Sequence, residues 1–93
     1  MKATYLVCYD IANPRRLGRV FRFMKGRGMH VQYSVFRCRL TWPELQDMKR
    51  KLTSIINTAE DDVRIYPLPS DGDMVVAMGL GDRVPPGAEI YLD

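Results

Sequence analysis

A long interval near the start of the chain has no acidic side chain: neither Asp nor Glu occurs from Ile11 to Pro43. Apart from Asp10, the acids collect from Glu44 onward, although the net charge of the whole chain is only +3. This segregation predicts a positive and a negative side, and it favours a polyanion such as a nucleic acid as partner of the positive side. The interval holds eight of the fourteen basic residues: Arg15, Arg16, Arg19, Arg22, Lys25, Arg27, Arg37 and Arg39.

Other absences exclude whole classes of protein. No apolar run approaches the ~20 residues of a membrane span, and the N-terminus lacks the sections of a secretory signal. We therefore expect a cytoplasmic protein without a membrane partner. Cys8 and Cys38 have no second Cys or His at metal-ligand spacing, so we interpret them as reduced core residues. The 93 residues suffice for one small domain, and a chain of this size buries only roughly 60% of its unfolded surface.

The segment from Ala3 to Ile11, ATYLVCYDI, is rich in aromatic and β-branched residues and predicts a central β-strand. Alternation along this strand places Tyr5, Val7 and Tyr9 on one face and Leu6, Cys8 and Asp10 on the other. Asp10 comes at the end of the strand, directly before a basic segment. A carboxylate in a basic setting suits a metal ion and a phosphate, whereas the structural alternative is a turn carboxylate that bonds to nearby amides.

A basic amphipathic helix is predicted after Asn13, which is a good N-cap, and Pro14, which suits the first helical turn. Its buried stripe is expected to consist of Leu17, Val20, Phe21 and Met24. Arg15, Arg19 and Arg22 form an adjacent charged stripe, and we interpret it as a phosphate-contacting face because counter-charges are missing.

The segment from Met29 to Leu40 is extended but longer than a typical strand. It either bends once near Ser34 or consists of two short strands with a very tight connection. Ser34 is interpreted as the bend rather than as a hydroxyl that contacts substrate. His30 has no triad partner in view, so we expect a hydrogen-bonded or exposed histidine.

Thr41 and Glu44 have the spacing of a capping box and predict the start of a second helix. Residues 62–68 predict a strand whose end Pro67 places at an edge or a bulge, and residues 73–78 and 89–92 predict two further strands. The apolar face of the second helix is expected to consist of Leu45, Met48, Leu52, Ile55, Ile56 and Ala59.

The resulting order of elements is that of an α+β ferredoxin-like sandwich, βαββαβ, if the long extended segment counts twice. We expect residues 1–80 to form this domain and residues 81–93 to form a tail whose strand adds to a sheet edge, its own or a neighbour's. The helices cover one face of the sheet, and a homodimer with a two-fold axis is the simplest cover for the other.

Three motifs in this order resemble one known family. YDI at residues 9–11, VQYSVF at 31–36 and VRIYPL at 63–68, with an Arg-rich first helix between the first two, are similar to the CRISPR-associated Cas2 family. The likeness extends from Tyr5 to about Met78. The sequence departs from the family pattern at two places, and both leave fewer carboxylates to bind a metal. Arg37 follows SVF where relatives usually have Glu, and the ANP loop after the first motif lacks the acids often found there.

The resemblance implies a ferredoxin-like homodimer in which Asp10 of each subunit reaches the interface, where the pair can hold Mg²⁺ or Mn²⁺. It also implies cleavage of phosphodiester bonds in RNA or duplex DNA by some members, and a scaffold role beside the integrase subunit that captures new spacer DNA. Exchange of the C-terminal strand between subunits belongs to the same expectation.

Two hypotheses follow for function. In the first, the protein is a metal-dependent endonuclease with Asp10 as metal ligand and catalytic residue and with Arg16 and Arg19 on the scissile phosphate. Tyr9 then shapes the site, and Ser34 and Phe36 build its floor, although for Tyr9 and Phe36 we favour the alternative of packing in a dimer core. In the second, which we favour as the biological role, it is a non-catalytic adaptor that binds duplex DNA through Arg15, Arg16, Arg19 and Arg22. A toxin-like endoribonuclease is a further alternative.

Overall fold

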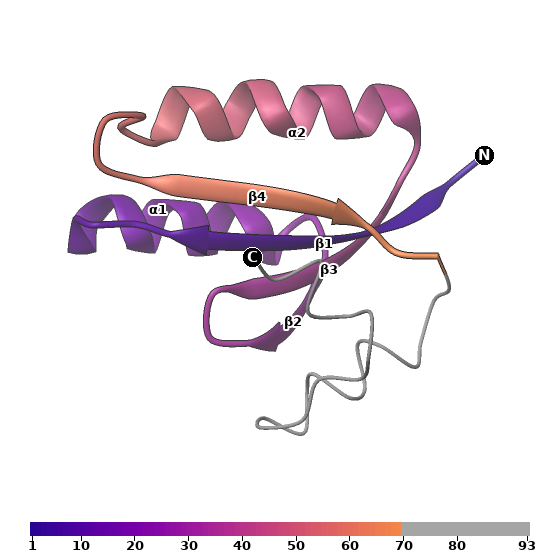
Figure 1. The fold of residues 1–93 in the computed structure, drawn as a ribbon, viewed down its shortest axis with the longest axis horizontal. Coiled ribbons are helices and arrows are strands. Elements are labelled where there is room, and N and C mark those ends of the chain that lie inside the picture. The colour runs from indigo at the N-terminus through magenta and orange to yellow at the C-terminus, as the bar shows by residue number, and fades with distance from the viewer. Residues whose placement is uncertain (70–93) are drawn as a thin grey trace.

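The computed structural model describes residues 1–69 of the chain, and these residues form a ferredoxin-like α+β sandwich (Figure 1). Strands and helices follow the predicted βαββαβ order. In chain order they are β1 (Ala3–Asp10), α1 (Pro14–Lys25), β2 (Met29–Gln32), β3 (Val35–Leu40), α2 (Trp42–Ile55) and β4 (Asp62–Pro67).

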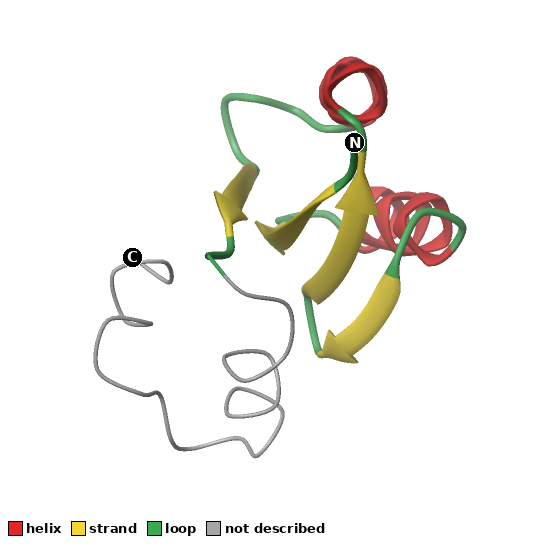
Figure 2. Ribbon diagram, turned by 90° about the vertical axis from the view of Figure 1, so that its right-hand side faces the viewer, coloured by secondary structure: helices red, strands yellow, loops and turns green. Residues whose placement is uncertain are grey.

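The four strands form one antiparallel sheet in the order β2-β3-β1-β4, so β1 is an inner strand as predicted. It pairs with β3 on one side and with β4 on the other, so that Val7 lies opposite Phe36 and opposite Ile65. Both helices lie on the same side of the sheet (Figure 2). The end of β1 therefore lies beside the start of β4, and this end of the sheet carries Asp10.

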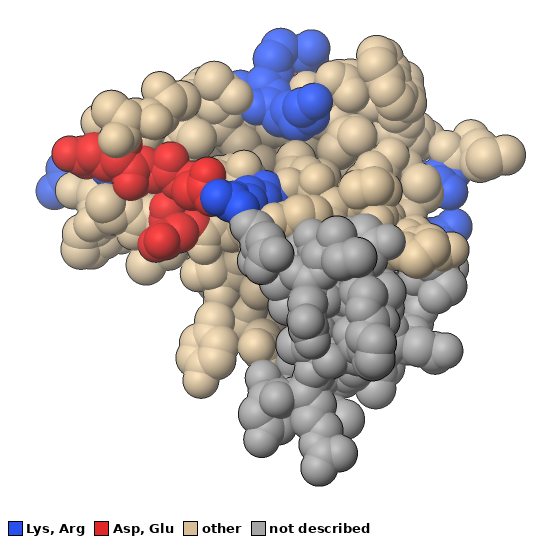
Figure 3. Space-filling view, in the orientation of Figure 1, with Lys and Arg blue, Asp and Glu red and all other residues tan. Residues whose placement is uncertain are grey.

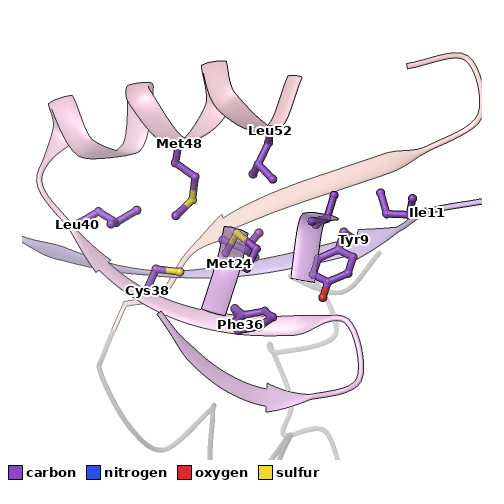
Figure 4. Packing of buried hydrophobic residues seen from close by; sticks show 10 residues of the cluster. Tyr9, Ile11, Met24, Phe36, Cys38, Leu40, Met48 and Leu52 are labelled. Carbon is purple, nitrogen blue, oxygen red and sulfur yellow. The ribbon is translucent and has the colours of Figure 1, made fainter. Parts of the chain in front are cut away.

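The two faces of β1 bury different clusters, as the alternation in the sequence predicts. Val7 and Tyr9 belong to the main core beneath the helices (Figure 4), with Tyr5 packed against it. Leu6 is fully buried on the opposite face, where Cys8, Val31, Val35, Tyr66 and Leu68 pack against it. Apolar side chains thus occupy both faces of the sheet.

Helix α1 begins as predicted at Asn13, whose side-chain oxygen accepts the amide hydrogens of Arg15 and Arg16 at 2.9 and 3.0 Å. Val20 and Met24 are buried, and Phe21 packs against the core. The prediction for Leu17 is wrong, because its side chain remains 38% exposed. In the first turn of α1 it is the Arg16 side chain, 21% exposed, that turns toward residues 57–61.

The long extended segment is two strands, which confirms the second of the two alternatives. Tyr33 and Ser34 form a two-residue turn between β2 and β3, and Gln32 pairs with Val35 across it. Tyr33 has a positive φ of 41°, a conformation that residues other than Gly rarely adopt. Ser34 is the bend, as expected.

Helix α2 begins with the predicted capping box. The Thr41 amide donates to the Glu44 carboxylate at 2.7 Å, and the Glu44 amide donates to the Thr41 hydroxyl at 3.2 Å. Met48 and Leu52 are buried in the core, with Leu45, Ile55 and Ile56 packed against it. The prediction that Ala59 continues this face is wrong: the helix ends at Ile55, and Ala59 lies exposed in the following turn.

Strand β4 is an edge strand of the described sheet and ends at Pro67, as predicted. The expected strands at 73–78 and 89–92, and the tail of residues 81–93, lie outside the described residues. Within residues 1–69, neither helix has the length and apolar character needed to cross a membrane.

Candidate functional site at the end of strand β1

Asp10 is the last residue of β1, and its side chain is exposed. Directly opposite it on β4 is Asp62. Residues directly opposite in an antiparallel pair project to the same face with Cβ atoms roughly 5 Å apart. The end of the sheet therefore presents two carboxylates on one face, the face opposite the helices.

This arrangement corrects the expectation that Asp10 lies in a purely basic setting. Acidic side chains gather at the end of the molecule where β1 ends and β4 begins (Figure 3). The Asp62 carboxylate accepts a hydrogen bond from the Arg64 guanidinium at 2.8 Å, so one of these charges is partly compensated. The sequence does not reveal that Asp10 and Asp62 are neighbours, because the sheet pairs two strand ends that lie far apart along the chain.

The donor chemistry of Asp10 fits a magnesium ion, which prefers carboxylate oxygens and needs only one or two of them when waters and phosphate complete its shell. Within residues 1–69 there is no group of three or more His, Cys, Asp or Glu side chains that could hold a metal. A metal bound at Asp10, alone or together with Asp62, must therefore draw its remaining ligands from water, from a phosphate or from a second subunit.

The loop that follows Asp10 is held by Asp61. Its carboxylate accepts the Ala12 amide at 2.9 Å and the Asn57 amide at 2.8 Å, and the Arg16 guanidinium donates to both of its oxygens at 2.8 and 3.1 Å. The Asp61 side chain has no exposed surface. The hydrogen bonds from Arg16, supported by the two amides, hold the pKa of Asp61 well below its usual range. This network ties the turn after Asp10 to the turn before β4.

Arg16 differs in this respect from the other three arginines expected to bind nucleic acid. Its guanidinium is engaged by Asp61 and also donates to Glu60 at 2.9 Å, which raises the pKa of Arg16. Its charge is neutralised by two carboxylates. The structure thus assigns Arg16 a bracing contact within the chain, in place of the free guanidinium that the phosphate role requires.

Arg15, Arg19 and Arg22 remain exposed on α1. Among residues 1–69 no carboxylate forms an ion pair with any of the three, and the first turn of the helix has no acid. The Arg22 guanidinium lies over Gly18, where a Cβ atom, if present, would approach it to 3.3 Å. These three cations form what we call the α1 basic face, and it begins in the first turn of the helix that Asn13 caps.

Tyr9, Ser34 and Phe36 surround the end of β1 from within the chain. Tyr9 and Phe36 are stacked with ring centroids 6.3 Å apart, and the Tyr9 amide donates to the Ser34 carbonyl at 3.0 Å. Phe36 has no exposed surface, so the alternative of packing in a dimer core is wrong for this side chain. Burial raises the pKa of the Tyr9 hydroxyl. Tyr9 and Phe36 support the site from the core beneath it.

Sequence reasoning missed Asp61, Asp62 and Glu60 as neighbours of the site. The available signal was a run of three acids, Glu-Asp-Asp, at the start of a strand. The prediction for His30, exposed or hydrogen-bonded, is confirmed: the residue is exposed and its Nε2 atom lies 2.6 Å from the Tyr33 carbonyl oxygen.

Comparison with known proteins agrees with the fold and with the motifs. Residues 3–75 match the family model described as "CRISPR associated protein Cas2". A protein named CRISPR-associated endoribonuclease Cas2 2, from Thermodesulfovibrio yellowstonii, is 54% identical over 98% of this chain and 99% of its own length. A Nitrosomonas europaea protein named CRISPR-associated endoribonuclease Cas2 1 is 41% identical over 73% of this chain and 65% of its own length.

Solved structures have the same fold. A hypothetical protein from Thermus thermophilus superposes with a TM-score of 0.75 at 33% identity, covering 78% of this chain and 89% of its own. Streptococcus pyogenes Cas2 gives 0.66 at 38% identity, covering 70% and 84%. A chain of a structure titled partial Cas6-RT-Cas1–Cas2 complex gives 0.66 at 29% identity, covering 76% and 77%. The chain described here therefore belongs to the CRISPR-associated Cas2 family.

Proposed function

We propose that this protein is the Cas2 subunit of a CRISPR spacer-acquisition assembly, in which a homodimer binds duplex DNA and acts as an adaptor for the integrase subunit. The observation that carries the proposal is the match of residues 3–75 to the Cas2 family. The similarity to a chain from a complex whose title includes Cas1 and Cas2 supports an integrase partner.

The α1 basic face supports the nucleic-acid part of the proposal. Phosphate contacts from exposed guanidinium groups position a protein on a duplex without reading its sequence, and they weaken as salt rises. Arg15, Arg19 and Arg22 are exposed and unneutralised by residues 1–69, whereas Arg16 is engaged within the chain. We therefore assign DNA contact to the first three.

A homodimer is supported by the face of the sheet that the helices leave free. Cys8, Val31, Val35, Tyr66 and Leu68 are only partly buried around Leu6 on that face. A two-fold axis over it brings the ends of the two β1 strands to one interface. Asp10 projects to the same face, so two subunits supply two Asp10 carboxylates.

Hydrolysis of phosphodiester bonds is the second candidate function, and the 54% identical relative named an endoribonuclease is the observation that favours it. A Mg²⁺ or Mn²⁺ ion held by the paired Asp10 side chains supplies Lewis-acid stabilisation and an acidified water when it is bound. The chain's own residues position the site and the substrate. Asp61 fixes the loop after Asp10, and Arg19 and Arg22 neutralise the phosphates of the substrate. RNA and duplex DNA are both substrates of this chemistry.

One set of measurements separates the two functions. Wild type, Asp10→Asn and the control Asp47→Asn, which changes an equally charged side chain on α2, are compared for cleavage of RNA and duplex DNA with Mg²⁺ or Mn²⁺. Duplex binding is measured across salt, and mass by sedimentation. If cleavage disappears only in Asp10→Asn while duplex binding persists, both functions are present.

Equal traces of cleavage in all three proteins point to contamination and leave the adaptor alone. A wild-type protein that sediments as a monomer at working concentrations contradicts the shared metal site. Absence of duplex binding at low salt contradicts the adaptor role itself.

A further inference from the structure

The turn between β2 and β3 places an aromatic side chain in solvent under backbone strain. Tyr33 is 87% exposed, more than Trp42 at 68%. Its φ of 41° lies in the left-handed region, whereas Ser34 has no positive φ. A two-residue turn with only its first residue in this region has the type II′ pattern, in which Gly is the usual occupant of that position. Tyr at such a place costs stability without burying the ring.

Two polar contacts hold the backbone of this turn. The Tyr33 carbonyl is 2.6 Å from Nε2 of His30, and the following carbonyl, of Ser34, accepts the Tyr9 amide at 3.0 Å. The His30 ring is itself fixed, edge-on to Phe21 at 5.3 Å and beside Phe36 at 4.9 Å. A strained residue persists only when its surroundings determine it, and such residues cluster at binding sites.

Two contacts relate the turn and its strand to the elements of the proposed nucleic-acid site. The bond to the Tyr9 amide places the turn beside the strand end that carries Asp10. The contact between His30 and Phe21 places β2 against the helix that carries Arg19 and Arg22. Proteins that bind unpaired nucleic acid combine exposed aromatic side chains, on which bases stack, with exposed cations that follow the backbone.

We propose that Tyr33 is a base-stacking residue that gives this surface a preference for unpaired bases, in single strands or at frayed duplex ends, over continuous duplex. A base inside a duplex already stacks on its neighbours and offers no free face. Because the turn holds the Tyr33 backbone in place, stacking orders only the side-chain torsions of the ring. This inference rests on the proposed nucleic-acid function and adds a substrate preference to it.

The test compares Tyr33→Ala, Tyr33→Phe and Tyr33→Gly with wild type on a single-stranded oligonucleotide and on the blunt duplex of the same sequence. The Ala variant should lose roughly 10-fold in single-strand affinity and keep its duplex affinity. The Phe variant should bind both as wild type does. The Gly variant should melt at a higher temperature than the Ala variant, since Gly accepts the positive φ, yet show the same loss of single-strand affinity.

Trp42→Ala provides the matched control, since Trp42 is also an exposed aromatic but begins α2 at the other end of the molecule from the turn (Figure 1). It should leave both affinities unchanged. An oligonucleotide with 2-aminopurine reports stacking directly: wild type and Tyr33→Phe should quench its fluorescence, and Tyr33→Ala should not.

Three outcomes overturn the inference. The Ala variant retains full single-strand affinity, or it loses duplex affinity to the same extent, or sedimentation shows that it has lost a dimer and that the ring is a contact between two copies of the chain. A wild-type protein that binds neither probe overturns the proposed nucleic-acid function itself, which separates that failure from the failure of Tyr33 as a stacking residue.

Discussion

Arg16 on α1 and Asp61 before β4 form a two-pronged ion pair, with Nε to Oδ2 at 2.8 Å and Nη2 to Oδ1 at 3.1 Å. The pair joins residues 45 positions apart in the sequence, and the Asp61 side chain in it has no exposed surface. Two amides, of Ala12 and Asn57, complete the shell of the carboxylate. Loss of the Asp61 charge therefore affects two turns at once.

Acid is expected to weaken the protein through Asp61. Its pKa in the folded chain is lowered below the ordinary value of 3.8, so the pair stabilises the fold above about pH 4 and this contribution disappears as the pH falls further. Asp61→Asn should lower the melting temperature markedly at pH 7, and the gap from wild type should narrow below pH 4. Thermal melts from pH 7 to pH 3 measure both.

The control for this prediction is Asp47→Asn, in which a partly exposed carboxylate that pairs with Arg50 on the α2 surface is neutralised. Exposed pairs of this kind contribute little, so its melting temperature should stay near that of wild type at every pH. A gap between Asp61→Asn and wild type that stays constant across this range would contradict the assignment of the pH dependence to Asp61.

Gly28 is expected to be irreplaceable because the chain directly before β2 approaches β3 there at close range. A Cβ atom at Gly28 would lie 2.5 Å from the Cys38 sulfur and 2.6 Å from the Arg37 carbonyl oxygen. Gly28→Ala should therefore reduce the free energy of unfolding by about 2 kcal/mol or more, as overpacking does. Gly26→Ala is the matched control, because its Cβ has no contact closer than 3.7 Å and its φ is −85°. Urea unfolding of the two variants should separate them, and equal losses would argue against a steric cause.

Both thiols are expected to react slowly. Burial raises the pKa of Cys8 and of Cys38 to about 11, so at pH 8 only about 0.1% of each is thiolate. Reaction with a disulfide reagent at pH 8 should be slow in the native protein and should accelerate strongly in denaturant. Rapid labelling of native protein would contradict the burial of these thiols.

Removal of charge from the α1 basic face is expected to weaken duplex binding without regard to sequence. The double variant Arg19→Gln with Arg22→Gln should lose affinity equally on unrelated duplexes. The slope of log affinity against log salt should become shallower by roughly 2, since about 0.9 is lost per phosphate contact. Filter binding or fluorescence anisotropy at several salt concentrations measures it.

Arg50→Gln is the control for the α1 basic face. Arg50 is an exposed guanidinium on α2 but is paired with Asp47 at 2.8 Å, so its loss should leave the slope unchanged. If the salt dependence of affinity is unchanged in the double variant, or if affinity is lost on one DNA sequence only, α1 does not bind the DNA backbone as proposed.

Local patterns were sufficient for most of the fold. Asn13 with Pro14 marked the start of α1, and Thr41 with Glu44 marked the start of α2, because capping depends on residues within one turn of each other. The faces of β1 followed from alternation. Leu17 and Ala59 were wrongly assigned to the buried faces of the two helices. Both lie near an end of the predicted apolar stripe, where the helical spacing of apolar residues continues but no core surface remains for them to pack against.

The candidate site was predictable only in part. Asp10 at the end of a strand could be recognised from its motif, and the exposed Arg15, Arg19 and Arg22 from the missing counter-charges. The ion pair between Arg16 and Asp61 was not predictable from the sequence. Nothing in the sequence distinguishes Arg16 from the other three arginines of α1, and only the packing of α1 against the sheet determines which of them contacts an acid.

The amino-acid sequence by itself determined the order of strands and helices, the central strand, the helix caps and the segregation of charge, since each depends on neighbours along the chain. Only the tertiary structure decided that Asp10 faces Asp62, that Asp61 binds Arg16 and that Tyr33 is held exposed at positive φ. These relationships depend on strand register and on the approach of distant loops, and both are set by the burial of the core between sheet and helices.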